Sequence, residues 1–373
     1  MTTGSTVLVV GGGFAGCAAA TFLARQGAQV DVVEIRDDVP RAGSGITVQG
    51  NALRVLRELG VWEDAEDHGY AFTTLGMRTP DGHLVAEFED VRTGGPDLPA
   101  TLGMERPTLA RILADAAREA GASLRFGLTV TSLEQDAAGV QATFSDGATG
   151  QYDLVVGADG VNSAVREMIG IETGPKPLGM GIWRVFIPRP ESIQRTELAY
   201  GGRCFIAGFC PTAEDSMYAY LVEEAEDRSN LTPDRQRQIM EDLAASYGGP
   251  WNEIRPLISA AEAINYTWFE SHVIDGPWHR GRVVLIGDAA HSCPPTLAQG
   301  AAMALEDAQV LGQEIEARGL DKGLAAFVER RRPRVEQTVA ASVQLCTWLI
   351  EGTQDADVPG LIGRTMGMLK EPA

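Results

Sequence analysis

Lysine is almost absent from this sequence: only Lys176, Lys322 and Lys370 occur, so none lies in the first 175 residues. Basic residues number 31 against 51 acidic ones, which leaves a net charge of −20 with neutral histidines. Nucleic acids and anionic membrane surfaces are bound by clustered Arg and Lys, and both repel a chain of this charge. The composition therefore argues against these partners and favours a small-molecule ligand.

Cysteine is also sparse, and its pattern excludes disulfide frameworks and paired metal ligands. The five cysteines are widely scattered and odd in number: Cys17, Cys204, Cys210, Cys293 and Cys346. Such thiols indicate a reducing compartment, so we expect a cytoplasmic protein with no metal site. No run of about 20 apolar residues is present, which predicts no membrane-spanning helix.

The length of 373 residues points to more than one packed unit. Single cores stop growing at about 250–300 residues, so two units are expected. Hydrophobic residues make up 44% of the chain and charged residues 22%, which is ordinary for a globular protein.

The N-terminal segment has the pattern of a βαβ unit. A β-branched run at 6–10 precedes Gly11-x-Gly13-x-x-Gly16, an Ala-rich stretch follows at 17–26, and a second strand at 29–34 ends in Glu34. In this motif the glycines permit a tight turn, approach of a pyrophosphate and close helix packing, while Glu34 meets ribose hydroxyls. The motif predicts an adenine dinucleotide, NAD or FAD; the alternative is a glycine-rich turn without a ligand.

A second unit is predicted from period-two segments. The hairpin of 75–78 and 84–88 turns at Pro80-Asp81-Gly82, and four further strands are expected at 181–187, 203–210, 216–223 and 263–272, with a helix at 233–247. Helices are also expected at 52–60 and 108–120. We assign 1–72, 101–175 and 275–330 to a cofactor domain, 73–100 and 176–274 to a mainly antiparallel substrate domain, and 331–373 to a C-terminal helix and tail.

Two later stretches carry a family resemblance. They are Asp153-Leu-Val-Val-Gly-Ala-Asp159-Gly-Val-Asn-Ser163-Ala-Val-Arg166, and Gly287-Asp288-Ala-Ala-His291 continuing to Pro295-x-x-Ala298-Gln299-Gly300. With the N-terminal glycines, the chain resembles the single-component FAD-dependent aromatic hydroxylases, the para-hydroxybenzoate hydroxylase family, over about residues 5–350. The resemblance implies an α/β fold: a Rossmann-like FAD-binding domain with a parallel sheet, an antiparallel substrate domain and C-terminal helices.

The resemblance also implies which residues meet FAD. Asp288 is expected at the ribityl chain, Arg106 at the flavin, and the helix start at Ala298 near the pyrimidine edge, although the family usually has Gly at that position. Asp159, with Ser163 and Arg166, would serve FAD and the visiting nicotinamide nucleotide, or else Asp159 caps a helix. The full predicted cofactor set is Gly11, Gly13, Phe14, Ala15, Gly16, Glu34, Arg41, Gly45, Arg106, Val130, Asp159, Asp288, Ala298, Gln299, Gly300 and Ala301.

No second Gly-x-Gly-x-x-Gly follows a strand, so NADH or NADPH is expected to visit transiently as reductant. A flavin hydroperoxide would then transfer oxygen from O₂ to a small activated aromatic or heteroaromatic compound. The expected catalytic residues are Pro295, His272, Tyr218, Arg184 and Thr47. The face shared by Tyr218 and Tyr220, or the face of the strand that carries His272, would line the pocket; the alternative for each side chain is a core role.

Other functions are weighed on the same residues. A flavin-dependent halogenase needs a lysine in its N-terminal domain, which this chain lacks. A flavin reductase or dehydrogenase is the second enzymatic alternative, and a non-catalytic flavoprotein binding module is a third. A monomer or homodimer is expected.

Overall fold

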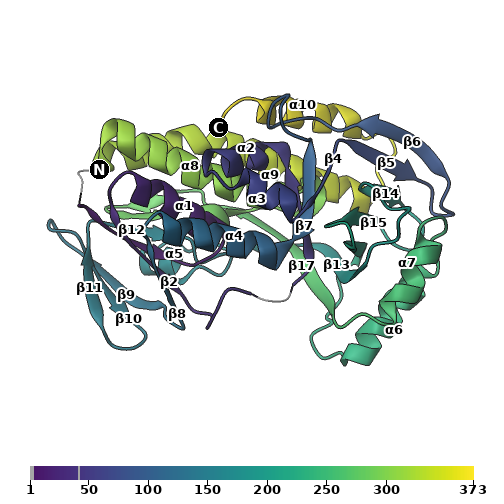
Figure 1. The fold of residues 1–373 in the computed structure, drawn as a ribbon, viewed down its shortest axis with the longest axis horizontal. Coiled ribbons are helices and arrows are strands. Elements are labelled where there is room, and N and C mark those ends of the chain that lie inside the picture. The colour runs from purple at the N-terminus through teal and green to yellow at the C-terminus, as the bar shows by residue number, and fades with distance from the viewer. Residues whose placement is uncertain (1–3, 41–42) are drawn as a thin grey trace.

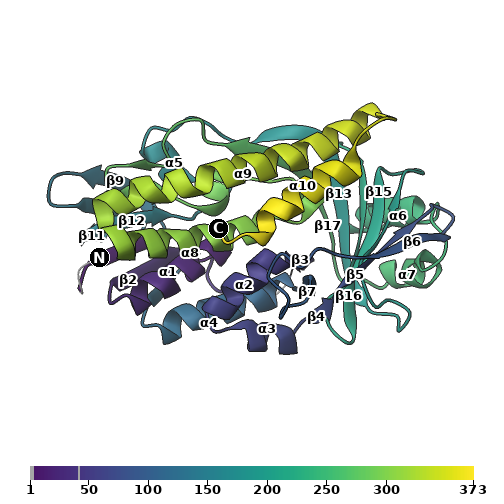
Figure 2. The same ribbon diagram turned by 90° about the horizontal axis from the view of Figure 1, so that it is seen from above.

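A computed structural model describes residues 4–40 and 43–373 of the chain. A parallel sheet and a large, mainly antiparallel sheet lie next to one another, and one long C-terminal helix, α9 Leu320–Glu351, runs along both (Figures 1 and 2). Arg41, predicted to approach the adenosine half of FAD, lies outside the described residues.

The parallel sheet has six strands in the order β18-β19-β12-β1-β2-β8, and only β18 among them pairs antiparallel. Its strands are β1 Thr6–Val10, β2 Gln29–Glu34, β8 Ser123–Phe126, β12 Leu154–Gly157, β18 His279–Arg280 and β19 Val283–Leu285. Val7, Leu8 and Val9 are fully buried, so both faces of β1 are covered by other elements. This burial explains the uninterrupted apolar runs of the sequence.

Four helices of this unit carry or support the site. They are α1 Phe14–Arg25, α2 Gly50–Glu58, α4 Arg106–Glu119 and α8 Gly300–Arg318, and the short helices α3 Trp62–Asp67 and α5 Ala164–Met168 complete the layer. Helix α1 packs against both α4 and α8. Ala18, Ala19 and Ala20 are fully buried there, because small side chains let the helices approach.

Two three-stranded antiparallel sheets flank the parallel sheet. One contains β9 Val130–Gln135, β10 Val140–Phe144 and β11 Thr149–Tyr152, and the other β3 Gly45–Gln49, β7 Thr101–Glu105 and β4 Tyr70–Phe72. The sequence predicted neither of these sheets. Strand β3 follows the Gly43–Gly45 loop and leads directly into α2.

The large sheet has eight strands in the order β20-β17-β13-β16-β15-β14-β5-β6. Their bounds are β5 Thr74–Arg78, β6 Leu84–Glu89, β13 Lys176–Pro188, β14 Glu197–Tyr200, β15 Ile206–Pro211, β16 Ser216–Glu224, β17 Ile264–Val273 and β20 His291–Ser292. Helices α6 Pro233–Ala244 and α7 Trp251–Ile258 cover one face, where Trp183, Phe209 and Trp251 are buried. The other face is turned toward the unit that contains the parallel sheet and toward α9.

The C-terminal segment contains more structure than the sequence predicted. Helix α9, Leu320–Glu351, begins before the expected boundary at 331, and the expected tail contains a further helix, α10, Val358–Lys370. Met366 and Leu369 of α10 are buried against Leu297 and Leu345. Among the described residues, no helix is both long enough and apolar enough to cross a membrane.

The predicted fold class is confirmed, with shifted element ends. The strand expected at 203–210 begins at Ile206, the strand expected at 181–187 is longer, and the helix expected to reach residue 247 ends at Ala244. The proposed division into cofactor domain, substrate domain and C-terminal segment stays a prediction.

Candidate flavin and substrate site

The glycine turn after β1 has the geometry that close backbone packing requires. Gly11 has a φ of +108°, and a Cβ there would lie 2.3 Å from the carbonyl oxygen of Ala158. A Cβ at Gly16 would lie 1.9 Å from the Gly11 carbonyl oxygen. A Cβ at Gly13, directly before α1, would meet no atom of the described chain within 4 Å. Open space at a helix N-terminus fits the pyrophosphate of a dinucleotide.

Glu34 is held against this turn. One carboxylate oxygen accepts the Gly12 N–H at 2.8 Å, and the other accepts the Arg36 N–H at 3.0 Å. Each oxygen retains a lone pair for a ribose hydroxyl, so both contacts are compatible with the predicted role. Phe14 and Ala15, in the first turn of α1, lie beside this turn.

Arg106 and Asp288 lie close enough to interact by charge, near the start of α1. The Arg106 guanidinium lies 5.3 Å from the centre of the Phe14 ring. Both charged side chains are solvent-accessible, yet surrounding protein removes enough water to lower the pKa of Arg106 and to raise the pKa of the Asp288 carboxyl. This polar wall fits a ribityl chain and flavin ring.

The turn before α8 has unusual backbone geometry. Pro295 begins the short helix η2, Pro295–Leu297, and Ala298 follows it at φ 51° and ψ 33°. Ala298 is the one non-glycine residue of the described chain with a positive φ. Here the family's usual glycine would be unstrained, and alanine keeps the left-handed conformation nonetheless.

The Gln299 side chain points toward α2. It is fully buried, and its Oε1 accepts the Asn51 amide N–H at 3.1 Å. Gln299 is therefore able to meet the flavin only through its backbone, as are Gly300 and Ala301 at the start of α8. A helix N-terminus directed at the pyrimidine edge favours negative charge on it.

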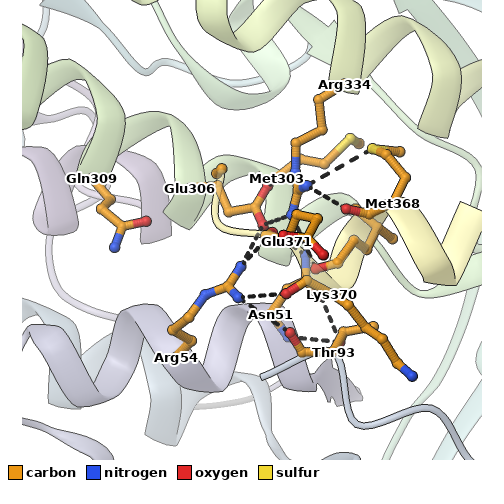
Figure 3. Close-up of polar contacts among 12 residues, drawn as sticks. Asn51, Arg54, Thr93, Met303, Glu306, Gln309, Arg334, Met368, Lys370 and Glu371 are labelled. Carbon is orange, nitrogen blue, oxygen red and sulfur yellow. Dashed lines mark hydrogen bonds and ion pairs between the residues drawn. The ribbon is translucent and has the colours of Figure 1, made fainter. Parts of the chain in front are cut away.

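Behind this turn lies a buried ionic network that the sequence did not predict (Figure 3). Glu306 accepts hydrogen bonds from Arg334 at 2.7 Å and Arg331 at 2.9 Å. Burial alone raises the pKa of the Glu306 carboxyl, but the two arginines outweigh it and hold that pKa below its ordinary value. Two adjacent acids in an apolar stretch, Glu306 and Asp307, were the only sequence signal for it.

Asp307 connects the network to the flavin motif. One of its oxygens accepts Arg331 Nε at 2.7 Å, and the other accepts the Gly287 N–H at 2.8 Å and lies 2.6 Å from His291 Nε2. Gly287 and Asp288 form the short helix η1, Gly287–Ala289. Asp288 is thus held in place by a buried carboxylate on α8, and His291 braces the loop through the same carboxylate.

The Asp159 motif makes the contacts of a helix cap. The Asp159 carboxylate accepts from the Ser163 hydroxyl and from the Val165 N–H at 3.0 Å, at the start of α5. Arg166 donates to the carbonyls of Val161 at 3.0 Å and Ala289 at 3.1 Å. These contacts account for the motif structurally, and its nucleotide role stays a prediction.

His272, predicted as catalytic, and Val130, predicted to bind the cofactor, both have buried side chains. His272 is 6% exposed and contacts Ser292 Oγ at 2.8 Å and Arg166 at 3.4 Å. Burial, followed by the Arg166 charge, lowers the His272 pKa to about 4, so the imidazole is neutral at pH 7. Val130 begins β9 with its side chain in the core, which leaves only its backbone for a ligand.

Thr47 and Tyr218 meet between the two units. Their hydroxyl oxygens are 2.6 Å apart, and the Tyr218 ring stacks on Tyr220 with 5.6 Å between ring centres. A Cβ at Gly45 would lie 2.1 Å from the Tyr218 ring, so only glycine admits this contact. Burial raises the Tyr218 pKa, which keeps the phenol protonated.

Arg184 shares the sheet face of Tyr218 and Tyr220. Register pairs Arg184 with Tyr220, and its guanidinium donates to Thr267 Oγ1 at 2.9 Å. Burial lowers the Arg184 pKa, and the positive charge of Arg106 lowers it further.

The sequence left open which of two strand faces lines the substrate pocket. The face of Tyr218 is the one that also carries Arg184 and contacts Thr47. The opposite face of β17 packs its Tyr266 ring against Trp183 and exposes Trp268.

The fold and these contacts define a class: a two-unit flavoprotein with a dinucleotide site on its parallel sheet and a polar contact, Thr47–Tyr218, between its units. A family model described as an FAD binding domain matches residues 4–342. The chain belongs to this family and is an FAD-dependent monooxygenase of the aromatic-hydroxylase type. The predicted family, FAD and enzyme class are therefore confirmed.

Named relatives cover nearly the whole chain. A putative FAD-dependent monooxygenase, YetM, of Bacillus subtilis is 32% identical over 98% of this chain and 99% of its own. The 2-heptyl-3-hydroxy-4(1H)-quinolone synthase of Pseudomonas aeruginosa is 31% identical over 89% and 86%. A tetrameric 2-methyl-3-hydroxypyridine-5-carboxylic acid oxygenase of known structure is 26% identical, with a TM-score of 0.81 and 98% of both chains covered.

Proposed function

We propose that the protein consumes NADH or NADPH and hydroxylates a small activated aromatic or heteroaromatic compound. The observation that carries this proposal is the Thr47–Tyr218 pair beside Arg184, where a flavin-domain strand meets the large sheet. When bound, reduced FAD would supply the activation of O₂. The protein's own residues would hold the substrate, exclude water and stabilise the charge that develops on the ring.

The aromatic wall of the pocket suits a flat substrate. Phe72, Cys210 and Tyr218 form a buried cluster, against which Phe186 and Tyr220 pack. Such surfaces stack on rings and keep water away from a reactive centre. The Arg184 cation on this face would stabilise a phenolate or pyridinolate, whose electrons favour attack on the ring.

Proton handling falls to the hydroxyl pair in this proposal. The Tyr218 phenol stays protonated, and its single O–H is able to donate to a substrate oxygen when the Thr47 hydroxyl, 2.6 Å away, donates to Tyr218 instead of accepting from it. His272 is less suited, because it is buried beside Arg166 and Ser292. Pro295, exposed at the start of η2, would offer its carbonyl to the substrate.

The test is oxidation of NADH and NADPH by purified, FAD-loaded protein, with oxygen uptake and hydrogen peroxide followed. The names of the relatives direct the panel toward 4-quinolones, hydroxypyridine carboxylates and phenolic acids. We expect one compound to accelerate oxidation many-fold with little peroxide. Strong oxidation without any aromatic stimulation would favour the reductase alternative instead.

Arg184→Met tests the electrostatic role. We expect a loss of about a hundredfold in stimulated kcat/KM, the size found when one stabilising donor is removed from a developing anion. Arg228→Met is the matched control, because Arg228 lies over Trp183 on the opposite sheet face. An equal loss in both variants would remove Arg184 from the proposed mechanism.

A further inference from the structure

Asn51 contacts two residues that flank the flavin-facing end of α8. A single amide nitrogen, Nδ2 of Asn51, lies 3.1 Å from Gln299 Oε1 and 3.1 Å from Glu306 Oε1. Figure 3 shows Asn51 next to Glu306, beneath Arg334 and beside Thr93. All of these side chains except that of Arg334 are fully buried.

The direction of these hydrogen bonds follows from charge. Arg331 and Arg334 keep Glu306 ionised, so Glu306 accepts only. Asn51 must then turn its NH₂ group toward Glu306, because its oxygen would be repelled. Thr93 supports this orientation, since its hydroxyl accepts the Asn51 backbone N–H at 2.8 Å and lies 3.4 Å from Asn51 Oδ1.

The Gln299 amide is oriented in turn. Its oxygen faces the Asn51 NH₂ group, and its own Nε2 is buried without a hydrogen-bond partner in the part of the chain that the structure describes. Because this donor has no partner among residues 4–40 and 43–373, the hydrogen bond from Asn51 is the contact that orients the Gln299 amide. Gln299 immediately precedes Gly300, so the Asn51 bond fixes the backbone of the strained Ala298 turn.

Asn51 also belongs to the substrate side of the site. It lies four residues after Thr47, in the first turn of the helix that continues β3. One side chain therefore links the strand that contacts Tyr218 to the turn that faces the flavin.

We propose that Asn51 is a positioning residue: its amide holds Gln299, and so fixes the N–H groups at the start of α8 against the flavin and relative to Thr47. The proposal rests on the placement of the flavin pyrimidine edge at this helix start. It does not depend on which aromatic compound is hydroxylated or on the nicotinamide nucleotide used.

The first test uses Asn51→Leu and measures FAD binding to apoprotein. Without the amide, the turn must be ordered when FAD binds, so we expect the dissociation constant of FAD to rise about tenfold, which corresponds to ~1.4 kcal/mol. Reduced FAD carries the negative charge that these N–H groups favour, so we expect its dissociation constant to rise by a further tenfold. That difference makes the two-electron midpoint potential about 30 mV more negative.

Gln26→Leu is the matched control. The Gln26 amide also ties a neighbouring element to α8, by donating to the Gly312 carbonyl at 3.0 Å, but it does so twelve residues beyond Gly300. A general loosening of α8 lowers the melting temperature in both variants. Only a positioning role changes FAD affinity and potential in Asn51→Leu while leaving both unchanged in Gln26→Leu.

Two further variants test the same hydrogen-bonded contact. If Asn51→Leu does not fold, Thr93→Val removes the hydroxyl that orients the amide while preserving the shape, and we expect the same changes at smaller size. In a cycle with Gln299→Met, the double variant should bind FAD no more weakly than the worse single variant.

Unchanged affinity and potential in both Asn51→Leu and Thr93→Val, or fully additive effects in the cycle, would overturn the proposal. Failure of every aromatic compound to stimulate NAD(P)H oxidation would instead count against the proposed function, since the FAD measurements need no substrate.

Discussion

At the scale of single residues, Ala298 has a left-handed backbone conformation that strains an alanine. A non-glycine residue in the left-handed region costs about 1–2 kcal/mol, whereas glycine there costs only the extra entropy of the unfolded chain. The turn persists because Gln299 is anchored on one side and Leu297 is buried on the other. Local strain of this kind is sustained by surrounding contacts.

Ala298→Gly is therefore expected to leave the free energy of unfolding unchanged or to raise it by up to about 1 kcal/mol. The matched variant Ala317→Gly lies exposed in the same helix, α8, and should lower it by about 0.5–1 kcal/mol. Urea unfolding of both variants gives the comparison. Equal destabilisation by the two glycines would show that the left-handed turn carries no strain.

Residue predictions from sequence succeeded where the constraint is local. Gly11 and Gly16 are required by backbone atoms of the same turn and its neighbouring strand, so a short motif identifies them. Asn51 and Glu306 are 255 residues apart, and their contact depends on how α2 and α8 pack. A single sequence carries no signal for such a pair.

At the scale of elements, the buried parallel strands were predictable because both of their faces are apolar. The β9–β11 sheet was missed because its strands are short and largely exposed, as the burial of Val130–Gln135 illustrates. Helix α10 was missed for another reason: Gly360, Gly363 and Gly367 give it a low intrinsic helix propensity. Its stability comes from packing and from charged contacts at its end.

Those contacts make a prediction for Arg54. Its guanidinium donates to the carbonyls of Lys370 and Glu371, both at 3.1 Å, at the C-terminal end of α10. We expect Arg54→Met to lower hydrogen-exchange protection in α10 about fivefold, as for a loss of ~1 kcal/mol. Exchange of the parallel sheet should not change.

Arg57→Met provides the comparison, since Arg57 is exposed on the same helix one turn from Arg54. Unaltered protection of α10 in Arg54→Met, or the same loss in Arg57→Met, would contradict the anchoring role. Arg334 should be the stronger anchor, because it bonds both Glu306 and the Met368 carbonyl within 2.9 Å.

At the scale of the whole molecule, α8 and α9 connect the two units through charge as well as packing. Arg331 and Arg334 on α9 neutralise Glu306 and Asp307 on α8, in a chain whose net charge is −20. Breaking such a buried pair costs about 3–5 kcal/mol. The carboxylates have lowered pKa values, so their stabilisation is present above pH ~4.5 and is lost only as the pH falls below it.

His272 acts in a separate and higher pH window. Its pKa is about 4 in the folded protein and 6.5 as the ordinary value, because the folded site is buried and lies beside Arg166. Between these values the unfolded chain binds a proton that the folded chain does not. Stability is therefore unaffected above pH ~6.5 and falls as the pH decreases toward 4, by about 2 kcal/mol at pH 5.

The resulting prediction concerns unfolding free energies measured in urea at pH 8, 6.5 and 5. His272→Asn should abolish about 2 kcal/mol of the loss between pH 8 and pH 5, whatever its effect at pH 8. The exposed His83→Asn serves as control and should retain the full loss. If His272→Asn keeps the pH dependence of the unaltered protein, the imidazole titrates normally in the folded state, and its burial beside Arg166 would not desolvate it.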